Sequence, residues 1–112
     1  MTIRETAAML TAEILQDQFE DSPLRGAYTS DLLSDVMANA KEGGALITIQ
    51  AHKNTVAVAS LVNISLIILC NNRPVQDTEM LEAAREEGIA VIRTKENQFT
   101  VSGKLYAALT RN

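Results

Sequence analysis

The single histidine of this chain, His52, stands in a short polar segment together with Lys53, Asn54 and Thr55. A histidine can bind a ligand or transfer a proton near neutral pH, and a lysine beside the first turn of a helix favours an anionic group such as phosphate. The same residues also suit plainer structural roles, because Asn54 is a good helix cap and His52 can close a turn. We expect a small anionic ligand to bind here, with capping and turn formation as the alternative.

Two further polar segments have the same character. Asn71, Asn72 and Arg73 precede Pro74; the planar fork of an arginine can clamp an anion, whereas Asn-Asn-x-Pro is equally a turn signature. Thr94 directly follows another apolar run, where capping and solvation are again the alternative. The predicted ligand-binding set is therefore His52, Lys53, Asn54, Thr55, Asn71, Asn72, Arg73 and Thr94.

The sequence predicts neither a metal centre nor a catalytic thiol. His52 has no second histidine or cysteine at a coordinating spacing. Cys70 ends an apolar run, where burial would keep its thiol protonated and unreactive. Asp31 and Asp35 lie one helical turn apart and could hold a divalent ion, but a solvated helix face with capping is the simpler interpretation. We expect no metal and no cofactor.

Three apolar runs must position these residues: 45–50, 65–70 and 89–93. None alternates with polar residues, and helix-like segments separate them, which is typical of a parallel sheet covered on both faces. Ligands gather at the carboxyl ends of such strands, so the three polar segments should meet at one edge. The predicted fold is α/β: one compact domain over residues 1–112, with a mostly parallel central sheet of about 4–5 strands and helices on both faces.

The remaining elements follow from caps and periodicity. Thr2 and Glu5 fit a capping box, Ser30 is a candidate N-cap, and glycines mark two helix ends. We expect helices at residues 3–10, from Ser30 to Gly43, at 55–62, from Asp77 to Gly88 and from Asn97 onward, with further strands at 12–16 and 26–29.

Residues 55–62 are rich in β-branched side chains, which suits a strand. Only Asn63 and Ile64 separate them from the run at 65–70, however, and the sequence supplies no turn between two neighbouring strands. We interpret 55–62 as a buried helix capped by Asn54. Its apolar residues would pack either inside the chain or against the same helix of a second copy.

Composition narrows the functional classes. The 112 residues carry a net charge of −4, with 4% aromatics and no Trp, so a nucleic-acid interface with basic stripes or stacked rings is not expected. The single cysteine excludes an internal disulfide, and no apolar run reaches the length needed to span a bilayer. The N-terminal residues lack a signal-peptide pattern, and a cytoplasmic location is expected.

Several segments in a fixed order also carry a family resemblance. They are Gly26–Tyr28, Asp31–Met37, Ala45–Gln50, His52, Asn54, Val56–Ala59, Ile67–Leu69, Glu87–Ile92 and Ser102–Tyr106. Over most of the chain this order resembles the DRTGG domain family. The resemblance implies a small α/β regulatory module. Such modules occur beside phosphotransacetylase domains, between the CBS domains of pyrophosphatases, and as stand-alone proteins encoded near iron hydrogenase genes.

The chain departs from this family at two points. Residues 51–54 occupy the place of the namesake acidic–arginine–threonine turn. The family fold is similar to the N-terminal, non-kinase domain of HPr kinase/phosphorylase, but a kinase needs a P-loop, and neither Gly43–Gly44 nor Gly103–Lys104 supplies its spacing. We therefore expect no kinase activity.

The leading hypothesis is a non-catalytic bacterial regulatory or interaction module that forms a homodimer. It would sense a small anionic ligand, a nucleotide or phosphorylated metabolite, or dock on a partner enzyme of anaerobic hydrogen or carbon metabolism. The alternative is a small enzyme acting on a phosphorylated substrate, with His52 as acid/base and Lys53 and Arg73 as phosphate binders. A third possibility is a purely structural dimerisation unit without a concave pocket.

Overall fold

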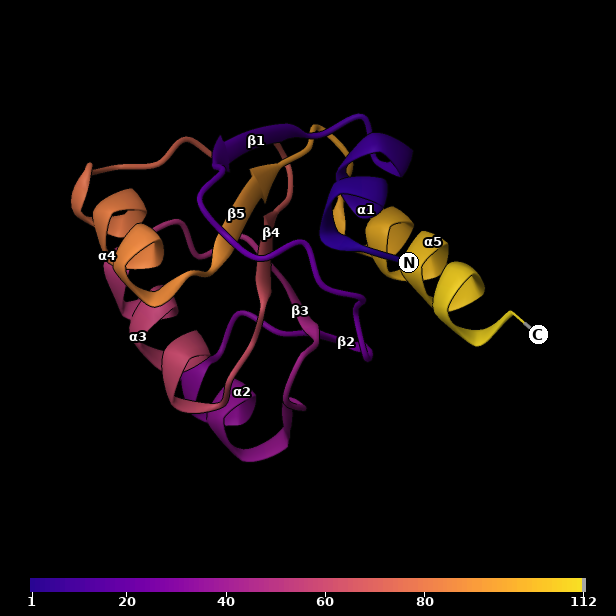
Figure 1. The fold of residues 1–112 in the computed structure, drawn as a ribbon, viewed down its shortest axis with the longest axis horizontal. Coiled ribbons are helices and arrows are strands. Elements are labelled where there is room, and N and C mark those ends of the chain that lie inside the picture. Colours follow the sequence, from indigo (N-terminus) through magenta and orange to yellow (C-terminus); the bar gives the residue numbers. More distant parts are fainter. Residues whose placement is uncertain (112) are drawn as a thin grey trace.

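A computed structural model describes residues 1–111, in which helices and strands alternate for most of the chain (Figure 1). The helices are α1 (Ile3–Met9), α2 (Leu33–Asn39), α3 (Lys53–Leu61), α4 (Glu79–Glu87) and α5 (Gln98–Thr110), and the strands are β1 (Glu13–Gln16), β2 (Ala27–Thr29), β3 (Ala45–Thr48), β4 (Leu66–Leu69) and β5 (Ala90–Arg93).

The five strands form one sheet in the order β1-β5-β4-β3-β2. The pairs β2–β3, β3–β4 and β4–β5 are parallel, whereas β1 joins β5 in the antiparallel direction at one edge. The carboxyl ends of the four parallel strands consequently lie along the same edge. The predicted α/β fold with a mostly parallel sheet is confirmed.

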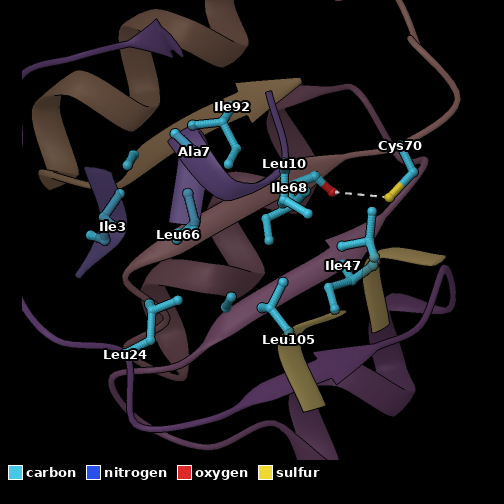
Figure 2. Close-up of a cluster of buried hydrophobic side chains, with 13 residues drawn as sticks. Ile3, Ala7, Leu10, Leu24, Ile47, Leu66, Ile68, Cys70, Ile92 and Leu105 are labelled. Carbon is cyan, nitrogen blue, oxygen red and sulfur yellow. Dashed lines mark hydrogen bonds between the residues drawn. The ribbon is translucent and has the colours of Figure 1, made fainter. Parts of the chain in front are cut away.

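Helices cover both faces of the sheet. The helices α2, α3 and α4 pack on one face, and α1 and α5 pack on the other (Figure 1). Neighbouring strand residues serve opposite layers: Leu46 and Ile67 point toward α2–α4, whereas Ile47 and Ile68 point toward α1 and α5, as Figure 2 shows for the second layer. Because both faces are buried, the central strands read as unbroken apolar runs.

Most predicted caps are observed. Thr2 and Glu5 form the full capping box of α1, and the Asn97 side chain accepts the Thr100 N–H at the start of α5. The Asp77 carboxylate accepts the Met80 N–H at 3.0 Å, although α4 starts at Glu79. Gly88 ends α4 in the left-handed conformation, with φ at 67°.

The predicted limits of α2 are wrong at both ends. Ser30 does not cap the helix; its hydroxyl instead accepts the Leu32 N–H in a local turn, and Leu32 takes the N-cap position in extended conformation. The helix stops at Asn39 because Ala40 is extended and the chain turns back toward β3. Only Val36 of this short helix is buried, while Leu32 and Met37 remain 65% and 49% exposed.

The helical interpretation of residues 55–62 is confirmed, but its start is corrected. Helix α3 begins at Lys53, with His52 rather than Asn54 at the N-cap position. Its apolar side chains Val56, Val58 and Ala59 are buried inside the chain, whereas Ala57 and Leu61 are exposed, Leu61 to 70%. Burial within one chain therefore accounts for the apolar character of this segment.

Candidate functional site

The predicted site residues come together at the carboxyl edge of the parallel strands. The Asn71 N–H donates to the Glu96 carbonyl at 2.9 Å, and the Asn72 N–H donates to the Thr94 carbonyl at 2.8 Å, so the loops after β4 and β5 are joined. Arg73 Nε donates to the Ile49 carbonyl at 3.3 Å and joins the same loop to the end of β3. The three polar segments thus meet, as the sheet topology predicts.

The loop after β4 is a tight turn with unusual backbone geometry. Asn71 and Asn72 both adopt positive φ angles, 58° and 51°. Asparagine tolerates this left-handed region better than most residues. Both asparagines and Arg73 are exposed, so the turn signature and an accessible polar surface coexist in this loop.

His52 is tied into a short polar chain at the end of β3. Its Nε2 lies 3.0 Å from Gln50 Oε1, and Gln50 Nε2 donates to the Asp31 carbonyl at 3.0 Å. The histidine therefore faces a neutral amide, and this contact orients the imidazole ring.

Lys53 points from the start of α3 toward α4. Its Nζ donates to Glu79 Oε2 at 2.8 Å, and this contact raises the pKa of the lysine. The two side chains are 58% and 61% exposed, and an exposed pair of this kind contributes only about 0–1 kcal/mol. An anionic ligand can therefore compete with Glu79 for the Lys53 ammonium.

Thr55 and Thr94 are both buried, and internal bonds hold their hydroxyls. The Thr55 hydroxyl donates to the Gln50 carbonyl at 2.8 Å, which fixes the turn between β3 and α3. The Thr94 hydroxyl donates to the Leu10 carbonyl at 3.2 Å and accepts the Glu96 N–H at 3.2 Å. These two residues hold the loops in place. Asn54, in contrast, lies exposed in the first turn of α3.

Asp31 links several segments at this edge of the sheet, a role that the sequence analysis did not predict. Its Oδ1 accepts three hydrogen bonds, at 2.9 Å from Thr48 Oγ1, 2.9 Å from the Ile49 N–H and 3.0 Å from Gln98 Nε2. It therefore ties the loop after β2 to the end of β3 and to the first turn of α5. The one available signal was its position just past a strand of the parallel sheet.

Asp35, which lies one helical turn after Asp31 in the sequence, has different hydrogen-bond partners. It accepts a hydrogen bond of 2.8 Å from the Tyr28 hydroxyl and another of 2.8 Å from Asn39 Nδ2. The Tyr28 bond is the main reason that the pKa of Asp35 is lowered and that of Tyr28 raised. Asp31 and Asp35 thus have separate partners, and no group of three or more potential metal ligands occurs among residues 1–111.

Cys70 is fully buried at the end of β4, as predicted from its place in the apolar run. Burial raises the pKa of its thiol to about 12. Figure 2 shows the side chain in the apolar layer, with its sulfur directed to the Ile68 carbonyl. A thiol in this setting stays protonated at neutral pH and is a poor nucleophile.

A hollow of about 290 Å³ opens beside the loops after β4 and β5. Asn72, Thr94, Arg93 and Lys95 are among its lining residues. Arg93 is paired with Glu13 at 2.9 Å. A larger hollow, of about 480 Å³, lies away from these loops, between β2 and α5.

Comparison with known proteins places the fold. No protein-family model and no curated protein sequence matches the chain. Among solved structures, the chain is similar to the CBS and DRTGG domains of the regulatory region of Clostridium perfringens pyrophosphatase, in complex with its activator diadenosine tetraphosphate. The TM-score is 0.70 at 19% identity over 93% of this chain. The chain spans less than half of that structure, 45%. It is a DRTGG-like α/β domain, which confirms at the level of fold the resemblance read from the sequence.

Among the residues that the structure describes, no helix is both long enough and apolar enough to cross a membrane.

Proposed function

We propose that this chain is a non-catalytic regulatory module that binds a small anionic ligand, a nucleotide or a phosphorylated metabolite, at the carboxyl edge of its sheet. The observation that carries the proposal is the convergence of the loops after β3, β4 and β5 around Arg73. The similar pyrophosphatase region binds a nucleotide activator, which supports the same class of ligand here.

The charges at this edge suit such a ligand. Arg73 uses its Nε for the Ile49 carbonyl, which leaves the terminal N–H groups of the guanidinium for a phosphate. Lys53 stands on the same side of the sheet at the amino end of α3, where backbone N–H groups also attract anions. Asn71 and Asn72 offer exposed amides beside Arg73. Together these groups would form an anion-binding set on the two segments that follow β3 and β4.

The absence of catalysis in this proposal rests on the chemistry of individual side chains. His52 is paired with the Gln50 amide, and Cys70 is buried with a raised pKa. Neither provides the nucleophile–base pair that covalent catalysis requires. An enzyme using His52 as acid/base is the competing proposal, and turnover of a phosphorylated substrate that is lost in His52→Ala would favour it.

By its DRTGG-like fold we further propose that the module works as a homodimer and responds within bacterial hydrogen or carbon metabolism, either through its ligand or by docking on a partner enzyme. The ligand and dimer parts of this proposal are independent. Each can be tested on the purified chain.

The ligand part predicts a stabilisation by mass action. With diadenosine tetraphosphate, ATP, AMP and acetyl phosphate as probes, a ligand at 100 times its Kd adds about 2.7 kcal/mol to the free energy of unfolding, and the melting temperature should rise by roughly 10 °C for a domain of this size. Arg73→Ala and Lys53→Ala should abolish most of this shift.

Arg25→Ala is the matched control. Arg25 is also an exposed arginine, paired with Glu42, but it precedes β2 at the opposite edge of the sheet. The Arg25→Ala substitution removes the same charge and should leave the ligand-induced rise in melting temperature intact. A shift of equal size in the Arg73→Ala protein, or none with any probe, contradicts the proposed site.

A further inference from the structure

Strand β2 forms an open edge of the sheet. Its neighbour is β3 on one side, and no strand among residues 1–111 pairs with it on the other. The Ser30 N–H and the Gly26 carbonyl bond to β3. Since backbone groups alternate in direction along a strand, the N–H and C=O groups of Ala27 and Thr29 point away from the sheet. Both residues are exposed.

An apolar hollow adjoins this edge. It measures about 480 Å³ and lies between β2 and α5, with Ile47 at its base. Phe99 and Tyr106 line it from α5, one above the other at a seven-residue spacing, and they are 88% and 73% exposed. Gly103 lies between them on the helix and leaves the space open.

The lining of the hollow contains no charged residue. Its polar members include Thr29 and Ser102, whose hydroxyls share a hydrogen bond of 2.6 Å that holds α5 over β2. Two nearly bare aromatic rings beside an unpaired strand are unusual for a surface that stays in water. Depletion of charge and enrichment in aromatic rings are typical of the core of a protein–protein interface.

We propose that a second copy of this chain covers this surface through a two-fold axis beside Tyr28. Antiparallel pairing of the two β2 strands would set Ala27 of each copy opposite Thr29 of the other, so that both residues exchange N–H···O=C bonds. The result is one continuous sheet through both copies. Both α5 helices then lie on the same face of it, side by side, with Phe99 and Tyr106 between them.

The exposed rings supply about half of the area that a small, stable dimer interface needs. Burying the exposed parts of two aromatic side chains from each copy removes about 600 Å² from water, since such side chains bury about 150–250 Å² each. A small specific interface needs about 1,200 Å² in total. The two strand edges and the remaining lining of both hollows are the surface from which the rest would come. The contact is self-complementary, because one patch supplies both the strand edge and the rings.

This inference deepens the homodimer part of the proposed function and rests on it. The surface differs from α3, the dimer helix considered from the sequence, whose apolar residues are used inside the chain. It also lies apart from Arg73 and Lys53, so dimerisation and ligand binding can fail separately.

The test is the solution mass of the full chain by light scattering and sedimentation equilibrium, from 1 to 100 µM. We expect the natural chain to be a dimer and the Phe99→Glu/Tyr106→Glu double variant to be a monomer, with its dissociation constant raised at least 100-fold. Both positions are exposed, so the variant should keep its circular dichroism. Leu61→Glu, at a 70% exposed position on α3, is the matched control and should stay dimeric.

Hydrogen exchange then tests whether the two β2 strands pair in the dimer. The amides of Ala27 and Thr29 should be protected in the dimer and should exchange fast in the double variant. A double variant that remains dimeric, a Leu61→Glu variant that dissociates, or fast exchange at both amides in a stable dimer overturns this surface but leaves the homodimer. A natural chain that is monomeric at 100 µM overturns both the surface and the homodimer, whereas the ligand part is decided by ligand-binding measurements and not by the solution mass.

Discussion

At the scale of single residues, Asp31 does the most to hold the candidate site together. One carboxylate oxygen accepts bonds from Thr48, from the Ile49 backbone and from Gln98. These partners belong to β3, to the segment after it and to α5. Without the carboxylate, a largely buried hydroxyl and a backbone N–H would lose their partner, and unmade bonds of this kind destabilise a fold.

We predict that Asp31→Ala lowers the free energy of unfolding by about 2–4 kcal/mol, since bonds to a charged acceptor contribute about 1.5–3 kcal/mol each and are not additive. Asp31→Asn keeps one acceptor oxygen and should lose less. Urea unfolding followed by circular dichroism measures both. A loss below 0.5 kcal/mol in the alanine variant would mean that Asp31 is an ordinary surface residue.

At the scale of elements, the contact between Tyr28 and Asp35 fastens α2 to the edge strand β2. Because this bond lowers the pKa of Asp35 and raises that of Tyr28, its contribution depends on pH in two directions. The Asp35 part is present above the ordinary aspartate value of 3.8 and is lost as the pH falls through the lowered folded pKa. The Tyr28 part is present below the ordinary value of 10.0 and is lost as the pH rises through the raised pKa.

Tyr28→Phe should therefore lower the melting temperature at pH 7, and the difference from the natural chain should shrink as the pH falls below the ordinary aspartate value of 3.8. Thermal melts at pH 7, 5 and 2.5 follow this difference. A gap of constant size across the acid range would show that the ring, and not its bond to a charged Asp35, determines the loss.

Some elements of this fold could be predicted from the sequence and others could not. The strands β3, β4 and β5 were predictable because burial on both faces imposes unbroken apolar runs. The meeting of their loops followed from parallel topology. The limits of α2 were not predictable, since Ser30 takes part in a local turn that competes with capping. The role of Asp31 depends on partners 17 to 67 positions away, and no local pattern in the sequence reveals them.

At the scale of the whole molecule, the two proposed surfaces occupy different parts of one sheet. The anion-binding loops lie at the carboxyl ends of β3, β4 and β5, whereas the surface for a second copy lies along β2 and α5. Asp31 connects the two regions, because it bonds both to the end of β3 and to the first turn of α5. This division lets the two proposals be tested independently.

The most direct test of the ligand site is an amide NMR titration of the ¹⁵N-labelled chain with diadenosine tetraphosphate. We predict the largest shift changes at residues 50–55, 71–73 and 94–97, with Gly43 and Gly44 at the amino edge unaffected and the changes lost in Arg73→Ala. Changes centred on the amino edge, or none at millimolar ligand, would contradict the claim that this edge of the sheet is an anion-sensing site.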